Sequence, residues 1–153
     1  MDVSRSNVTF DYRNVRVLVT GGSHGIGAGI AAAYRAAGAE VTITGTRPSA
    51  ADYDGGLDGY RYLQLELTDS DRILEVAGAL PGLDILVNNA GSNYAAENEY
   101  DPAVFERSVQ VNLLGAYRVA HACREKLANS DLPGGGSRSE EHTSELQSRL
   151  HLV

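Results

Sequence analysis

The chain has 153 residues, of which 42% are hydrophobic and 22% are charged, a composition typical of one globular domain. Thirteen Lys and Arg against 20 Asp and Glu give a net charge of −7, which argues against a nucleic-acid or anionic-membrane partner. The single cysteine, Cys123, excludes an internal disulfide and a cysteine-rich zinc site, and no metal site is expected.

The N-terminal segment Met-Asp-Val-Ser-Arg-Ser lacks the apolar core of a signal peptide. No apolar run in the chain approaches the roughly 20 residues that span a bilayer. We therefore expect a cytoplasmic protein.

The sequence predicts four strands. Segments of strand length, rich in β-branched or alternating apolar residues, lie at 14–20, 41–46, 60–67 and 83–88.

Helix-like segments lie between these strands. Apolar residues recur at helical spacing from 26 to 37, before Gly38, and again from 70 to 80, where Ser70 can act as the N-cap. Asp101-Pro102 is typical of a helix start, and that helix is expected to run to about residue 127. Alternating strands and helices predict an α/β fold, a doubly wound parallel sheet covered on both faces (a Rossmann fold).

The chain changes character after the Pro-Gly-Gly-Gly-Ser stretch at 133–137, where a further strand is due. Residues 138–148 show no strand alternation and resemble a translated reading frame of a common DNA-sequencing adapter at every position. We interpret 1–137 as the Rossmann part and 138–153 as a foreign, disordered tail. The sheet is then expected to stop after about four strands, with the fourth as an open edge.

A glycine-rich loop joins the first strand to the first helix. Its glycines suit a tight turn off the strand (Gly21), close approach of the backbone to a pyrophosphate (Gly25) and close packing of the helix on the sheet (Gly27). The helix N-terminus adds free N–H groups and the positive end of its dipole. The loop therefore predicts a dinucleotide site that includes Gly21, Ser23, His24, Gly25, Ile26 and Gly27.

The spacing Thr-Gly-x-x-x-Gly-x-Gly at 20–27 resembles the short-chain dehydrogenase/reductase family. Two more family motifs follow in order, Asn88-Asn89-Ala90-Gly91 and Val109-Gln110-Val111-Asn112. The resemblance covers about 14–137.

The resemblance also assigns roles to residues of these two motifs. It implies that Asn88, Ala90 and Gly91 belong to the cofactor site, with the small residues leaving space and the Asn side chains tying strand ends. It implies that Asn112 is catalytic, because the matching Asn breaks its helix locally and holds a water in the proton relay of relatives.

The stretch after the second strand bears on the choice of cofactor. NAD-specific Rossmann sites carry a carboxylate there for the ribose 2′-hydroxyl, but Thr44-Gly45-Thr46-Arg47 contains no acid. Thr46 and Arg47 can bind a 2′-phosphate instead, and His24 stands where NADP-preferring relatives often carry a basic residue. NADP is therefore predicted over NAD, the alternative being that Arg47 is a solvated loop residue.

One further contact is implied for the adenine. In the family, an Asp after the third strand meets the adenine amino group. In this chain Glu66 takes that position, followed by Leu67, and we expect Glu66 to keep the role.

The family's reacting groups are Asn, Ser, Tyr and Lys, the last two spaced Tyr-x-x-x-Lys so that the lysine lowers the pKa of the tyrosine. This chain has one lysine, Lys126, and the residue four positions earlier is Ala122. The family's catalytic serine follows a fifth strand, where the tail begins. The resemblance thus implies hydride transfer between NADP(H) and a ketone or secondary alcohol, in a chain without the catalytic Ser, Tyr and Lys and expected to be inactive.

Other functions remain as alternatives. One is a non-catalytic dinucleotide-binding or regulatory module. Among enzymes, β-ketoacyl thioester reduction and oxidation of a sugar, steroid or other alcohol stay open. A P-loop NTPase is disfavoured because the chain has no Gly-Lys-Ser/Thr. The expected partner is a small carbonyl or alcohol substrate, and the resemblance implies a homo-oligomeric parent enzyme that packs through the helix of Asn112.

Overall fold

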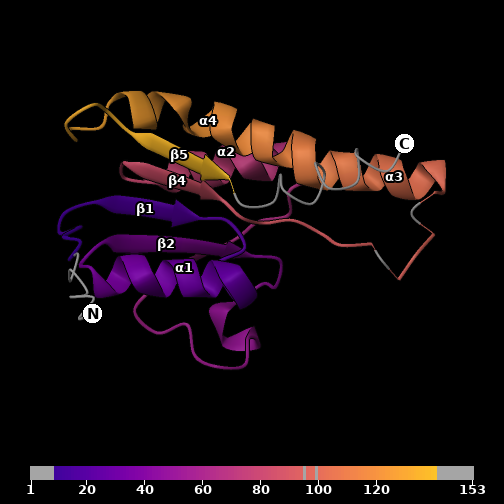
Figure 1. Cartoon of the computed structure of the whole chain (residues 1–153), viewed down its shortest axis with the longest axis horizontal. Helices are drawn as coiled ribbons and strands as arrows, with labels where there is room; N and C mark the ends of the chain where they lie inside the picture. The colour runs from indigo at the N-terminus through magenta and orange to yellow at the C-terminus, as the bar shows by residue number, and fades with distance from the viewer. Residues whose placement is uncertain (1–8, 95, 99, 141–153) are drawn as a thin grey trace, which may run out of the picture.

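Five parallel strands form the middle layer of the computed structural model, which describes residues 9–94, 96–98 and 100–140 (Figure 1). The strand order is β3-β2-β1-β4-β5, so the direction of winding reverses between β1 and β4, as in a doubly wound fold. The predicted fold class is confirmed, with five strands rather than about four. The strands are β1 (Arg16–Val19), β2 (Glu40–Gly45), β3 (Arg61–Gln64), β4 (Ile85–Asn88) and β5 (Ser137–Glu140).

Helices cover both faces of the sheet, with α1 on one side and α2 and α4 on the other (Figure 1). A 3₁₀ turn, η1, lies between β2 and β3. The π-helical segment η2 connects α3 to α4, so that the three run on as one rod. Their bounds are α1 (Gly25–Ala36), η1 (Ala50–Asp52), α2 (Ser70–Ala79), α3 (Pro102–Val109), η2 (Gln110–Gly115) and α4 (Ala116–Ala128).

The central strand β1 supplies side chains to two cores. Val17 and Val19 pack into the core between the sheet and α1, whereas Leu18 packs into the core beneath α2 and α4. Successive side chains of a strand point to opposite faces, so a strand covered on both faces must be apolar at every position. This requirement explains why the Val-Leu-Val run of the sequence lies at the centre of the sheet.

The predicted starts of α2 and α3 are both found, but the N-cap of α2 is a different residue from the one predicted. The carboxylate of Asp101 accepts a hydrogen bond from the N–H of Ala103 at 2.8 Å, and Pro102 is the first helical residue, as predicted. In α2 the cap is Asp69, whose side chain accepts from the N–H of Arg72 at 2.9 Å. Ser70 is therefore the first helical residue rather than the N-cap.

Strand β5 corrects the expectation that no strand follows residue 137. Ser137, Arg138, Ser139 and Glu140 pair in parallel with β4, opposite Ile85, Leu86, Val87 and Asn88. Parallel pairing uses backbone groups, so an edge strand with exposed side chains needs no apolar alternation. Consequently β5, not β4, is the outer strand. The remaining tail, 141–153, lies outside the described residues, and its foreign origin stays a prediction.

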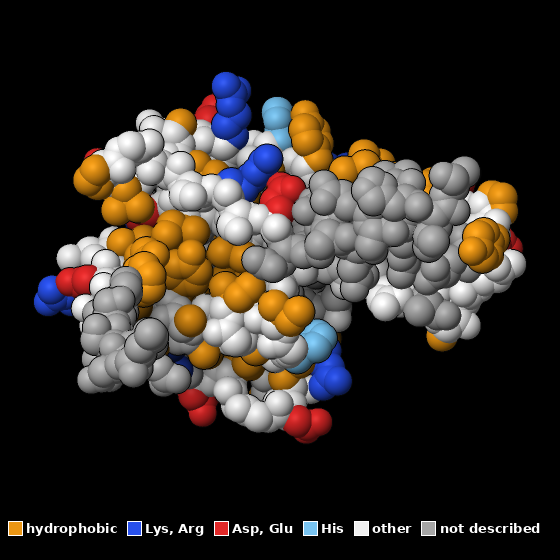
Figure 2. All heavy atoms as spheres, in the orientation of Figure 1, with side chains coloured by type: hydrophobic (Ala, Val, Ile, Leu, Met, Phe, Trp, Pro, Cys, Tyr) orange, Lys and Arg blue, Asp and Glu red, His pale blue; other side chains and the backbone are white. Residues whose placement is uncertain are grey.

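The described part of the chain contains no helix long and apolar enough to cross a membrane, and no group of three or more His, Cys, Asp or Glu side chains that could hold a metal ion. On the face in Figure 2, the basic side chains are scattered rather than gathered in one patch. Hydrophobic side chains gather over the strands on the same face.

The amino ends of β1 and β4 are joined by a buried carboxylate. Asp84 is 2% exposed and accepts hydrogen bonds from the backbone N–H and the guanidinium of Arg16, each at 2.9 Å. The hydroxyl of Ser130, between α4 and β5, donates to it at 2.6 Å. The hydrogen bonds from Arg16 hold the pKa of Asp84 well below its usual range.

We expect Asp84→Asn to lower the free energy of unfolding by about 2–4 kcal/mol at pH 7, because it leaves the Arg16 charge without its partner. The pKa of Asp84 is lower in the folded chain than the roughly 3.9 of an unfolded Asp. The pair therefore stabilises fully above that pH and less as the pH falls toward the folded-state pKa.

Urea unfolding at pH 7 and at about pH 3 measures this effect. The difference between wild type and Asp84→Asn should shrink at the lower pH, and the exposed Asp54→Asn should change stability little at either. An equal difference at both pH values would contradict the role given to the ion pair.

The first turn of α1 lies against the carboxyl end of β1. A Cβ at Gly27 would overlap the carbonyl oxygen of Gly21 and the side-chain amide of Asn89, whereas a Cβ at Gly29, in the same helix, would meet open space. Gly27→Ala should therefore lower the free energy of unfolding by about 1–3 kcal/mol through overpacking. Gly29→Ala should raise it by up to about 1 kcal/mol, because alanine is the better helix former. Urea midpoints that move in the same direction would count against this packing.

Candidate functional site

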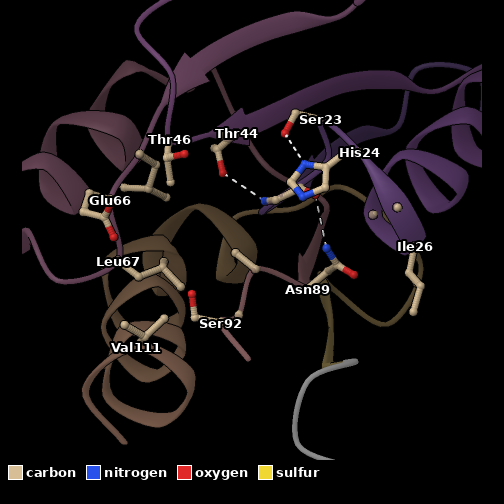
Figure 3. A pocket seen from close by; sticks show the side chains of 17 residues that line it. Ser23, His24, Ile26, Thr44, Thr46, Glu66, Leu67, Asn89, Ser92 and Val111 are labelled. Atoms are coloured by element: carbon tan, nitrogen blue, oxygen red, sulfur yellow. Dashed lines mark hydrogen bonds between the residues drawn. The ribbon is translucent and has the colours of Figure 1, made fainter. Parts of the chain in front are cut away.

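A pocket lies at the carboxyl ends of β1, β2, β3 and β4, beside the reversal of strand order between β1 and β4. This is the position where doubly wound sheets bind their ligands. Figure 3 shows Thr46 and Glu66 on one side of the pocket and Ile26 on the opposite side. The lining residues are Gly21, Ser23, His24, Gly25, Ile26, Gly27, Thr44, Gly45, Thr46, Leu65, Glu66, Leu67, Asn89, Ala90, Gly91, Ser92 and Val111.

The structure brings most of the predicted cofactor residues together in this pocket. Those that line it are Gly21, Ser23, His24, Gly25, Ile26, Gly27, Thr46, Glu66, Leu67, Ala90 and Gly91. Arg47 and Asn88 are predicted contacts that are not part of its wall.

Asn88 points away from the pocket. It is buried, and its amide nitrogen donates to the carbonyl of Ala116 at 3.2 Å, which ties β4 to the start of α4. The following residue, Asn89, faces the opposite way and lines the pocket, because neighbouring side chains alternate along an extended chain. Of the paired asparagines in the motif, the structure thus places the second, not the first, at the candidate site.

The loop after β1 is fixed by hydrogen bonds to the loop after β4. The hydroxyl of Thr20 accepts from the N–H groups of Asn89 and Ala90, each at 3.0 Å. The Asn89 amide donates to the carbonyls of Thr20 and Gly21 at 3.0 and 3.3 Å. From β2, the hydroxyl of Thr44 accepts from the N–H of Gly21 at 3.2 Å. These contacts fix the conformation of the glycine loop.

Asn89 and Thr44 are site residues that the sequence analysis missed. A signal was present for each of them. Thr44 is a polar residue near the carboxyl end of a strand of β-branched residues, and Asn89 stands beside the predicted Asn88 in the same motif. Hydrogen bonds between separate loops depend on the three-dimensional arrangement, and the sequence does not give that arrangement.

The start of α1 presents backbone donors to the pocket. Gly25 has a φ of +59°, a conformation that side chains with a Cβ rarely adopt, and it turns the chain into the helix. The N–H of Ala28 donates to the carbonyl of His24 at 3.2 Å, so the helical hydrogen bonds begin there. The N–H groups earlier in the first turn have no intrahelical partner and, with the helix dipole, suit an anion.

The side of the pocket at the end of β2 combines polar and basic groups. Thr46 and Glu66 line it, and Glu66 is the one acid among the lining residues. The His24 ring nitrogen Nδ1 lies 3.1 Å from the hydroxyl of Ser23. Arg47 is exposed and lies just beyond the pocket wall. Its guanidinium lies 4.8 Å from the centre of the Tyr53 ring and donates a hydrogen bond to the backbone carbonyl of Asp52.

Two tyrosines next to Arg47 share a hydrogen-bonded network. The hydroxyl of Tyr62 donates to the carbonyl of Arg47 and lies 3.4 Å from the hydroxyl of Tyr53, which accepts from the N–H of Arg47 at 3.0 Å. Burial raises the pKa of Tyr62, and the contact with Tyr53 raises it further. Burial also acts to raise the pKa of Tyr53, but hydrogen bonds to its oxygen, led by that from Tyr62, outweigh this effect and lower it.

Asn112 lies in the π-helical segment η2, which agrees with the local break in the helix that the resemblance implies. Its side chain does not line the pocket but holds Ser92, which does. The side-chain oxygen Oδ1 of Asn112 accepts a hydrogen bond from the backbone N–H of Ser92 at 2.8 Å, and its side-chain nitrogen Nδ2 donates to the backbone carbonyl of Ser92 at 3.0 Å. The hydroxyl of Ser108 lies 3.2 Å from the same amide. Asn112 therefore fixes the loop after β4.

These groups fit a dinucleotide. The loop glycines leave room where side chains would overlap backbone, and the helix start offers donors for a diphosphate. At the end of β2 no carboxylate is present in the sequence 44–47.

The chain is similar in sequence to a known protein family and to several of its characterised members. The family model described as short chain dehydrogenase matches residues 15–135. D-threitol dehydrogenase of Mycolicibacterium smegmatis is 29% identical over 86% of this chain and 54% of its own length. D-erythrulose reductase of Gallus gallus is 31% identical over 93% of this chain and 58% of its own length.

A solved structure agrees in fold as well as sequence. The active-site complex of Pseudomonas aeruginosa RhlG with NADP has a TM-score of 0.69 and 29% identity, and the match covers 82% of this chain and 53% of that one. The chain spans about half the length of the curated relatives described above. The glycine loop, the asparagine motif of β4 and the match over residues 15–135 together show that the chain belongs to the short-chain dehydrogenase family.

Proposed function

We propose that this chain is the cofactor-binding part of an NADP-preferring short-chain oxidoreductase. When bound, the nicotinamide supplies hydride transfer to a ketone or from a secondary alcohol. The residues of this chain bind and orient the cofactor. The start of α1 receives the diphosphate, Glu66 meets the adenine, and Asn112 holds the loop at Ser92.

One observation supports NADP over NAD above all others. The end of β2 carries no acid for a ribose 2′-hydroxyl. Thr46 and His24 line that part of the pocket and Arg47 lies just beyond the wall, while the Glu66 carboxylate on the same side comes from the segment after β3 and is assigned to the adenine. A carboxylate there would repel a 2′-phosphate, whereas an arginine donates charge-assisted hydrogen bonds to it. The NADP complex of a 29% identical neighbour is consistent with this choice.

We further propose that the 153-residue chain has no turnover on its own. No tyrosine in the sequence is followed four residues later by lysine. The one lysine, Lys126, donates from its Nζ to the carbonyl of Leu80 at 2.7 Å, which engages it away from the pocket residues. A general acid/base tyrosine with a lysine beside it is thus not among the groups that this chain brings to the site.

Two relatives support a small polyol or keto-sugar, because one is named a D-threitol dehydrogenase and another a D-erythrulose reductase, while a third, named an acetoacetyl-CoA reductase, keeps β-ketoacyl thioester reduction as an alternative. We propose such a carbonyl or alcohol as the substrate of the whole enzyme.

Self-association of the whole enzyme is part of the same proposal. Phe105, Leu113 and Tyr117 are each at least half exposed along the rod of α3, η2 and α4, an apolar surface suited to a second subunit. A cytoplasmic location stays a prediction.

Arg47→Ala should lower the ratio of NADP⁺ to NAD⁺ affinity by about tenfold or more, since a charge-assisted hydrogen bond contributes about 1.5–3 kcal/mol. Affinity for NAD⁺ should stay close to that of the wild type. Calorimetric titration with both cofactors measures the ratio.

Arg35→Ala is the matched control. Arg35 is also exposed and also lies over a tyrosine, Tyr60, at 5.0 Å, but it does not border the pocket. Its replacement should leave the ratio unchanged. If Arg47→Ala behaves like Arg35→Ala, the assignment of Arg47 to the 2′-phosphate is wrong.

The absence of turnover is tested by following NADPH absorbance with a panel of small ketones and keto-sugars. The purified chain should give the rate of the enzyme-free blank, while a full-length relative assayed in parallel shows that the conditions support catalysis. Turnover above the blank that Asn112→Ala abolishes would defeat this part of the proposal.

A further inference from the structure

Tyr53, which follows η1, folds back onto the end of β2 and touches both basic groups at the predicted 2′-phosphate site. Its ring lies under the guanidinium of Arg47 at 4.8 Å. The same ring stacks near the imidazole of His24, with 6.5 Å between ring centroids and 18° between planes. Its hydroxyl oxygen accepts a hydrogen bond from the backbone N–H of Arg47 at 3.0 Å. One side chain thus fixes Arg47 through both its backbone and its side chain.

The same hydroxyl occupies space that a side chain at Gly45 would need. A Cβ at residue 45 would overlap Oη of Tyr53 and would lie 2.9 Å from its Cζ and 3.0 Å from the hydroxyl oxygen of Ser23. Residue 45 lines the pocket at the end of β2, where NAD-binding Rossmann proteins carry their acid. A carboxylate at this position is therefore incompatible with Tyr53 as it lies.

The segment that carries Tyr53 is held in place independently of any ligand. Ser49 and Asp52 form a reciprocal capping box around η1. From β3, the hydroxyl of Tyr62 donates to the carbonyl of Arg47, and the amide of Gln64 donates to the carbonyl of Thr46 at 3.0 Å. The contacts of Tyr53 are thus part of a preorganised loop, and preorganisation reduces the ordering cost of binding.

We propose that Tyr53 is a positioning residue that sets the cofactor preference of this chain. It holds Arg47 toward a 2′-phosphate and fills the space at Gly45 that an acid for a 2′-hydroxyl would occupy. The inference rests on the proposed NADP site, and it adds to it a residue from the loop after β2, outside the pocket wall.

The test compares two probes that differ only in the 2′-phosphate, adenosine 2′,5′-bisphosphate and adenosine 5′-monophosphate. Calorimetry on the 153-residue chain gives the ratio of their affinities. Tyr53→Phe keeps the ring but removes the hydrogen-bond acceptor, so the ratio should fall about 3- to 10-fold. Tyr53→Leu also removes the ring beneath Arg47, so the fall should be larger. Affinity for the monophosphate should change less than about twofold in either variant, because no 2′-phosphate is involved.

Tyr60→Phe is the control, since Tyr60 carries Arg35 on its ring away from the pocket. Urea midpoints for all variants show that each is folded. A wild-type chain that binds both probes equally would overturn the NADP proposal and this inference with it. A wild-type chain that prefers the bisphosphate, with the ratio unchanged in Tyr53→Phe and Tyr53→Leu, would overturn the role of Tyr53 alone.

A double-mutant cycle tests the second half of the inference. Gly45→Asp should raise NAD⁺ affinity at least about tenfold more in the Tyr53→Leu background than in the wild-type background, because only there is the space free. Equal effects in the two backgrounds would show that Tyr53 does not exclude the acid.

Discussion

The close contact between the first turn of α1 and the ends of β1 and β4 is the constraint on which the site depends. Gly27 lies where any Cβ would overlap the Gly21 carbonyl and the Asn89 amide. That same amide donates a hydrogen bond to the carbonyl of Gly21, and the hydroxyl of Thr20 accepts one from the backbone N–H of Asn89. The helix start can therefore present its N–H groups at the reversal of strand order only because small residues and one asparagine allow this approach.

In the proposed function, the choice between NAD and NADP depends on a different part of the structure. The diphosphate cradle is built from backbone, so it suits NAD and NADP equally. Discrimination needs a group beside the ribose 2′-position, and we propose Arg47 for this role, on a loop that is hydrogen-bonded to β3 and contacts Tyr53. A charged side chain on a preorganised loop acts at the moment of binding, with little reorganisation.

The sequence predicted the parts of the fold that depend on local pattern. The alternating elements, the glycine loop and the cap at Asp101 follow from residue type and spacing, whereas the helical break near Asn112 was implied by the family resemblance. The parts that were missed depend on pairing between distant segments. Strand β5 forms because β4 offers a free backbone edge, which the polar composition of 137–140 does not reveal. The roles of Asn89 and Thr44 require loops far apart in sequence to meet. The role of Tyr53 requires the segment after β2 to fold back onto the end of that strand. The alternation that turns Asn88 away from the pocket depends on the exact end of β4.

The account is tested most directly by locating a nicotinamide cofactor on the chain. Nuclear magnetic resonance of the ¹⁵N-labelled protein, titrated with NADP⁺, follows each backbone amide separately. The largest shifts should fall on the amides of 21–27 and of Ala90 and Gly91, because these flank the diphosphate cradle. Shifts confined to other parts of the chain, or no shifts at millimolar cofactor, would contradict the claim that this loop binds a dinucleotide.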